Sequence, residues 1–263
     1  FGQTLSAILS TTSPRAWAFA LIGIDEYSQK FAGDRKVNQV RDELAGRLLK
    51  LYKGNRTEEW RWFEKELTYC NASLPHALLV SGRSIPNTEM IEAGLESLNW
   101  LSDLQSASQG YFVPIGSNGF YQCNGERARF DQQPVEAQTM VSACLEAFRI
   151  TKDKRWNKEA RMVFEWFLGR NDLNVSVYDP TTGGCRDGLH PDRVPAPVHP
   201  RRPDRHQHDH AAARLDDRAG RGDRLLALHR HPLPAAAARG AAAARRGRGG
   251  RGVGGARGAV RRP

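Results

Sequence analysis

The chain has 263 residues, of which 40% are hydrophobic and 26% are charged, and its formal net charge is +10. This length allows one or two domains with a hydrophobic core of ordinary size. The charge is unevenly spread: residues 1–194 carry 23 Lys and Arg against 24 Asp and Glu, whereas residues 195–263 carry 16 Arg and no Lys against 5 Asp. The basic character therefore belongs to the C-terminal part, and it does not predict nucleic-acid binding by residues 1–194.

The cysteines and the hydropathy pattern indicate the cellular setting. The four cysteines are widely spaced and include no Cys-x-x-Cys pair, which argues against zinc, a dithiol redox site or a disulfide framework and favours reduced thiols. No signal peptide is recognisable, and no apolar run is long enough to span a bilayer. Phe1 is not a natural start residue, so a preceding region is expected. We expect a cytoplasmic protein without a metal, a cofactor or a membrane partner.

Apolar residues in the first 194 positions recur at helical spacing and almost nowhere alternate. Ser13-Pro14 is typical of a helix start, and Gly33-Asp34 marks the turn before a second helix. The helices form three hairpins, and residues 31–49 resemble residues 150–168 loosely, which indicates repeated hairpins. The six predicted helices span about 14–31, 35–54, 72–80, 88–101, 134–148 and 153–168.

Three long connectors, residues 55–71, 106–133 and 169–193, are rich in aromatic, amide and acidic side chains. A helical bundle needs only short connections, whereas long polar and aromatic loops are where a repeated-hairpin fold would build a site. We therefore predict an all-α fold, a partial (α/α)6 toroid over residues 1–194, with a generic helical bundle as the alternative.

The first connector holds the densest group of functional side chains: Trp60, Trp62, Glu64, Tyr69 and Asn71. Flat aromatic rings stack on the C–H faces of sugars, while carboxylates and carboxamides bind sugar hydroxyls. The combination indicates a pyranose site. The alternative is that Trp60 and Phe63 anchor the connector on the core and that Glu64 caps a helix.

The second connector ends in Asp131, Gln132 and Gln133, just before a helix that begins at Pro134. Free backbone N–H groups and the positive end of the helix dipole lie there. We expect Asp131 or Glu136 to act as an acid or base and the glutamines to bind sugar hydroxyls. The alternative makes Asp131 the helix N-cap and Glu136 its capping-box partner.

The third connector places Asp187 in a glycine-rich segment, residues 179–189. Its glycines permit backbone conformations that aim the aspartate sharply, although a plain surface turn has the same composition. Residues 116–119 contain two glycines as well, but they predict a turn and not a phosphate loop, because no Gly-Lys-Ser/Thr follows.

Taken together, the motifs W-F-E-x-x-L-T-Y-x-N-A-x-L-P-x-A-L, F-D-Q-Q-P-x-E-A and D-P-x-T-G-G-C-x-D-G-L resemble the six-hairpin glycosidase-like region of some bacterial proteins. That region often follows a glycosyltransferase of the GT-B type, and the resemblance spans roughly residues 14–194. It implies an α/α toroid that acts in carbohydrate metabolism, with an attached glycosyltransferase as a partner. The chain departs from the family pattern: it lacks an upstream D-D-N-A-R-type motif and a downstream N-x-N-x-G-A-E-S-T stretch, and it has Cys70 where an acid is expected.

Residues 195–263 use only nine residue types, all of them encodable by codons that begin with G or C. A slipped reading frame in a GC-rich gene produces this composition, so we predict a frameshift near Val194 and a disordered, Arg/Ala/Gly-rich tail. The alternative is a genuine disordered arm that binds nucleic acid electrostatically. His206, His208 and His210 resemble metal ligands by residue type. Neither interpretation of the tail supplies surrounding residues that would orient their rings, so we predict no metal site there.

Three functional hypotheses follow. The first is an enzyme domain that cleaves or transfers glycosidic bonds of an oligosaccharide or glycoside. Glu64 and Asp131 would form its carboxylate pair, in the inverting geometry, with Asp187 in reserve. The second is a non-catalytic sugar-binding or scaffolding module of a glycosyltransferase, and the third is a nucleic-acid binder acting through the tail. We expect this fragment to be inactive and poorly soluble alone. The predicted substrate-binding residues are Trp60, Trp62, Tyr69, Asn71, Gln132, Gln133 and Glu136.

Overall fold

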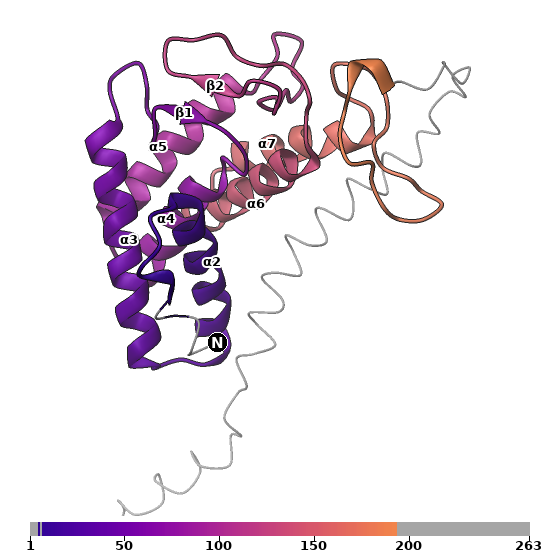
Figure 1. Ribbon diagram of the computed structural model, residues 1–263. Helices are drawn as coiled ribbons and strands as arrows, with labels where there is room; N and C mark the ends of the chain where they lie inside the picture. The colour runs from indigo at the N-terminus through magenta and orange to yellow at the C-terminus, as the bar shows by residue number, and fades with distance from the viewer. Residues whose placement is uncertain (1–4, 6, 194–263) are drawn as a thin grey trace, which may run out of the picture. The chain divides into compact units, whose positions relative to one another are not determined.

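A computed structural model describes residue 5 and residues 7–193, and the chain in this range is mostly helical (Figure 1). The all-α prediction is confirmed, and the six predicted helices appear with shifts of a few residues at their ends. The predicted tail, with its three histidines, lies outside the described residues. The helices are α2 (Pro14–Lys30), α3 (Arg35–Asn55), α4 (Ser73–Ser84), α5 (Thr88–Leu104), α6 (Pro134–Thr151) and α7 (Arg155–Glu165), which runs into a short 3₁₀ turn (Trp166–Leu168); a second 3₁₀ turn is Pro191–Arg193.

Local side-chain chemistry sets several of the helix starts. Ser13 caps α2 by accepting a hydrogen bond from the Ala16 N–H at 3.3 Å, and Pro14 occupies the first turn. Asp34 accepts hydrogen bonds from two backbone N–H groups in the first turn of α3, each at 3.1 Å. Asn87 caps α5 in the same way, at 3.0 Å from the N–H of Met90. These caps satisfy N–H groups that have no partner within the helix.

The helices pack as three consecutive hairpins: α2 with α3, α4 with α5, and α6 with α7. Helix α4 also packs against both α2 and α6, so one helix of each hairpin belongs to a central row (Figure 1). Near the C-terminal ends of this row, Arg83 of α4 bonds to Asp25 of α2 and to Glu146 of α6, both at 2.8 Å. Because the N-terminal ends of the same helices are also joined, as described below, α2, α4 and α6 run in the same direction.

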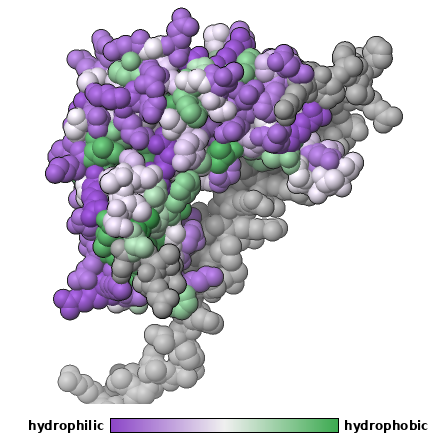
Figure 2. Space-filling model, viewed as in Figure 1, coloured by the Kyte–Doolittle hydropathy of each residue, from purple (hydrophilic) through white to green (hydrophobic). Residues whose placement is uncertain are grey.

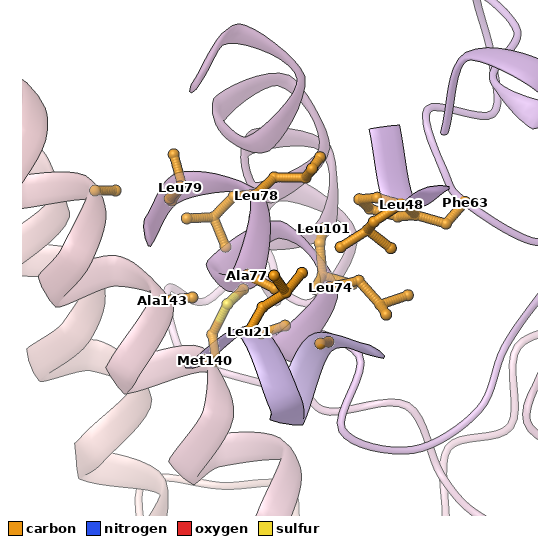
Figure 3. Close-up of a cluster of buried hydrophobic side chains, with 14 of the residues drawn as sticks. Leu21, Leu48, Phe63, Leu74, Ala77, Leu78, Leu79, Leu101, Met140 and Ala143 are labelled. Atoms are coloured by element: carbon orange, nitrogen blue, oxygen red, sulfur yellow. The ribbon is translucent and has the colours of Figure 1, made fainter. Parts of the chain in front are cut away.

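Buried apolar side chains from several helices form one hydrophobic core, part of which is drawn in Figure 3. Leu21 of α2 and Met140 of α6 both contribute to the buried cluster around α4, and each is 1% exposed. Removing such apolar side chains from water is the main favourable contribution to folding, at roughly 25 cal/mol per Å² of buried apolar surface. Other buried members of this cluster are Leu48, Phe63, Leu74, Ala77, Leu78, Leu101 and Ala143.

The three long connectors contact one another. In the first connector, β1 (Glu66–Leu67) pairs antiparallel with β2 (Tyr121–Gln122) of the second. The second connector meets the third where Gln132 and Leu189 exchange two backbone hydrogen bonds, at 3.1 and 2.8 Å. Side chains reinforce this second junction, because Asp172 accepts hydrogen bonds from Tyr111, Arg129 and Gln132. Segments far apart in the sequence are therefore held together near the start of α6.

The surface is mainly polar on the face shown in Figure 2, with small apolar patches between hydrophilic residues. Four large hydrophobic residues are exposed in the described part of the chain: Phe19, Phe31, Tyr69 and Tyr178. Among the described helices, none combines the length and the apolar character needed to cross a bilayer.

Candidate functional site

A buried polar network joins the N-terminal ends of α2, α4 and α6. Arg15, in the first turn of α2, donates a hydrogen bond to the Glu64 carboxylate at 2.6 Å and another to the backbone oxygen of Tyr69 at 2.6 Å. Its guanidinium lies 5.1 Å from the centre of the Tyr69 ring, within cation–π range. Arg15 is only 5% exposed, so its charge is compensated almost entirely by protein groups.

Asn71 connects this cation to α6. Its carboxamide oxygen accepts hydrogen bonds from Arg15 at 3.2 Å and from the Thr68 N–H at 3.0 Å. Its nitrogen donates to the Thr68 backbone oxygen at 3.1 Å and to the Glu136 carboxyl at 2.9 Å. Asn71 is completely buried, and these four bonds use its donor and acceptor groups. We call Arg15, Glu64, Asn71 and Glu136 the buried network.

Glu136 is the acid of this network whose titration is most strongly perturbed. It lies in the first turn of α6 and is 3% exposed, and burial raises its pKa to about 7, against the opposing effect of the Asn71 hydrogen bond. Its second carboxyl oxygen is buried and has no hydrogen-bond partner among the described residues. A carboxyl group in this state can hold or release a proton near neutral pH.

Burial also affects Cys70, at the position where the resemblance led us to expect an acid. The thiol belongs to a residue 5% exposed, and burial, followed by the nearby Glu136 carboxyl, raises its pKa. A raised pKa lowers the fraction of thiolate, which is the reactive form of cysteine. Cys70 therefore has neither the charge of the expected acid nor the properties of an activated nucleophile.

Asp131 lies in a second polar group at the same end of α6. Its carboxylate oxygen is 2.7 Å from Nδ1 of His190, and Nε2 of the same imidazole is 3.7 Å from a carboxylate oxygen of Asp187. The side chain of Asp187 is 79% exposed, whereas that of His190 is 22% exposed. The second and third motifs thus meet at His190. We call Asp131, His190 and Asp187 the His190 group.

A pocket of about 270 Å³ adjoins the His190 group. Asp187 and His190 line it on one side, and the aliphatic side chains of Leu173, Val175 and Val177 line it as well. This volume is below the usual range of roughly 300–1,000 Å³ for ligand pockets, which suits a single small ring better than an extended chain.

Five of the predicted substrate-binding residues are buried: Trp60, Trp62, Asn71, Gln132 and Glu136. Trp62 is completely buried and Trp60 is 5% exposed, with its ring N–H donating to the Glu64 backbone oxygen at 2.7 Å. The two rings pack against Trp100, so they anchor the connector on the core, as the alternative interpretation has it for Trp60. Gln132 is also fully buried, and its side chain bonds to Asp172 and to the ring N–H of Trp166. Contrary to the prediction, these side chains present no surface to a sugar.

The remaining predicted residues divide between the two polar groups. Glu64, Asn71 and Glu136 belong to the buried network, and Asp131 and Asp187 to the His190 group. Tyr69, 48% exposed, keeps an accessible ring beside Arg15. Gln133 is the N-cap of α6 and makes no capping hydrogen bond with its side chain. The capping-box alternative for Asp131 is therefore wrong, because Gln133 occupies the cap position.

Two residues central to these groups were not identified from sequence. Arg15 follows Ser13-Pro14 and has the sequence context of an ordinary residue in a first helical turn. A cation there lies at the unfavourable end of the helix dipole, and this position is a weak signal of a buried acidic partner. His190 directly follows D-G-L in the third motif. No protein-family model matches the sequence, and no curated protein is significantly similar to it.

Proposed function

We propose that residues 1–194 are part of an α/α toroid that acts on glycosidic bonds of an oligosaccharide or glycoside, as the six-hairpin glycosidase-like resemblance implies. The repetition of helix hairpins and the common direction of α2, α4 and α6 support the toroid. The observation that carries the functional proposal is the gathering of acidic side chains from three separate connectors near the start of α6. Sites of this class need two carboxyl groups that flank one bond.

In this proposal Glu64 and Asp131 form the carboxyl pair, with Asp187 in reserve, and Tyr69 offers an exposed aromatic face to a sugar. Glu136 lies behind the pair, because its carboxyl is buried and reaches Glu64 only through Asn71 and Arg15. Its role is to hold Asn71 in place and to keep a titrating proton near the site. One carboxyl group protonates the leaving oxygen, and the other activates the attacking group.

The test is to measure binding and turnover in parallel with a panel of nitrophenyl glycosides and of gluco- and manno-oligosaccharides. Turnover by this chain would overturn the expectation that it is inactive alone. The Glu64→Gln and Asp131→Asn variants are expected to lose turnover by about 100-fold or more while they keep ligand affinity. Glu58→Gln, an exposed acid in the same connector, is the matched control and is expected to leave both unchanged. Equal turnover in all variants would refute the two-carboxyl mechanism.

A non-catalytic sugar-binding module attached to a glycosyltransferase is the second candidate. The observation that favours it is that Glu64 and Glu136 are both engaged in internal hydrogen bonds. Such a module binds the same ligands, with no turnover in the wild-type chain, and loses affinity when Tyr69 is replaced by alanine. Nucleic-acid binding through the tail concerns residues outside the described range and stays a prediction.

A further inference from the structure

His190 lies between two acids that come from different connectors. Its position is set by the backbone: Gln132 and Leu189, the neighbours of Asp131 and His190, exchange hydrogen bonds at 3.1 and 2.8 Å. Gly188 allows this close approach, because a Cβ atom there would come within 2.8 Å of the Gln132 backbone oxygen and within 3.0 Å of His190 Nε2. The pairing of Asp131 with His190 is therefore built into the junction of the two connectors.

The two ring nitrogens of His190 have different surroundings. Nδ1 lies 2.7 Å from Asp131, within hydrogen-bond distance. Nε2 is buried, has no hydrogen-bond partner among the described residues, and lies 3.7 Å from Asp187, too far for a hydrogen bond. At this distance the Asp187 carboxylate is within ion-pair range of the same imidazole. A carboxyl, an imidazole and a second carboxyl thus follow one another, and two of them, His190 and Asp187, line the pocket.

We propose that His190 transfers a proton between Asp187 and Asp131 and thereby sets the protonation state of Asp131 at this pocket. In the transfer, the O–H bond of protonated Asp187 breaks as Nε2 gains the proton. The N–H bond at Nδ1 breaks as the Asp131 carboxylate gains a proton. The neutral imidazole is left with its proton on Nε2, and the reverse transfer restores it. No further reactant is required.

This assignment deepens the proposed function and rests on it, since Asp131 is the acid or base of that function and His190 would supply its proton. It also adds a subsite: the pocket walled by Leu173, Val175 and Val177 takes one sugar ring or the group attached to it, next to Asp187. Arg186 also lines this pocket, so the ligand meets both a cation and an acid at its rim.

The first experiment does not depend on any sugar. Nitrogen-15 NMR of the full chain, at a pH where the His190 imidazole is neutral, reports which ring nitrogen carries the proton. The proposal predicts that the proton resides on Nδ1 in the wild type and that Asp131→Asn abolishes this preference, whereas Asp187→Asn preserves it. A proton found on Nε2 in the wild type would overturn the proposal, whatever the fate of the proposed function.

The second experiment separates proton transfer from simple positioning. His190→Asn keeps a donor near the position of Nδ1, and His190→Gln keeps one near the position of Nε2, but neither can gain a proton at one nitrogen and release one from the other. With a nitrophenyl glycoside that the wild type turns over, both variants are expected to lose kcat by about 100-fold with little change in KM. Activity retained by His190→Asn would show that His190 only orients Asp131. If no glycoside is turned over, the proposed enzyme activity is refuted. The NMR result alone then decides whether Asp131 fixes the proton of the His190 imidazole on Nδ1.

Discussion

The buried carboxyl of Glu136 makes the stability of the fold depend on pH. Its pKa is about 7 in the folded protein, whereas an ordinary glutamate has a value near 4.5. Between these values the folded chain holds a proton that the unfolded chain has released. The free energy of unfolding therefore falls as the pH rises through this window, and this contribution levels off above pH 7.

Glu136→Gln removes this dependence and retains most of the shape. A pKa difference of about 2.5 units corresponds to about 3 kcal/mol. The glutamine oxygen can still accept the hydrogen bond from Asn71. We expect the stability of the variant relative to the wild type to increase by about 3 kcal/mol between pH 4 and pH 8.

The assay is urea unfolding followed by circular dichroism, with the midpoint and the slope fitted at each pH. Taking the difference between the two proteins removes the effect of every acid that they share. Glu58→Gln is the exposed control, and its difference from the wild type is expected to be constant with pH. A constant difference for Glu136→Gln as well would refute the reasoning, since it would mean that Glu136 does not gain a proton on folding.

Three further tests address the packing of the site and of the fold that carries it. Asn71→Ala removes the hydrogen bonds that the Asn71 side chain makes with Arg15 and with the buried Glu136 carboxyl and is expected to cost about 3 kcal/mol in urea unfolding; a cost below about 1 kcal/mol would contradict the network. Gly116→Ala places a Cβ atom 2.1 Å from the Phe130 backbone oxygen and is expected to cost about 2 kcal/mol or more in stability. Gly46→Ala, where α3 leaves open space, is the control and is expected to stabilise the fold by roughly 0.5–1 kcal/mol. If thermal melts ranked the two variants the other way, the connector around Gly116 would have to adapt freely. Arg83→Met removes the ion-pair partner of the nearly buried Asp25 and one of the two partners of Glu146, which keeps Arg149, and is expected to lower stability by about 2 kcal/mol in urea unfolding; an unchanged midpoint would argue against the ion pairs.

The helices could be predicted from sequence because their signals are local. Apolar spacing such as Leu44, Leu48 and Leu51 indicates which face of a helix is buried. Ser13 and Asp34 cap the first turns of α2 and α3 and so mark where these helices begin. The helix ends were less predictable: α4 extends to Ser84, beyond the last residue of the apolar pattern. The sixth helix is predicted to continue to Leu168, whereas α7 ends at Glu165 and the chain goes on as a 3₁₀ turn at Trp166–Leu168.

The site was harder to predict because its contacts cross between connectors. Residue type alone does not distinguish Tyr69, which is exposed, from Trp62, which packs edge-on against Phe63 in the core. Likewise, the sequence shows that Asp131 precedes a helix but not that it lies beside His190, 59 positions away. Such pairings depend on how the connectors meet, and no local pattern encodes them.

The most direct test of the account is to map where a glycoside binds. Backbone amide shifts of the full chain would be followed by NMR during titration with the glycoside panel. A carbohydrate site at the start of α6, with the adjoining pocket, predicts shifts confined to residues 64–73, 131–136, 173–177 and 186–190. Shifts confined to the outer faces of α3 and α5, or no shift at millimolar glycoside, would contradict it.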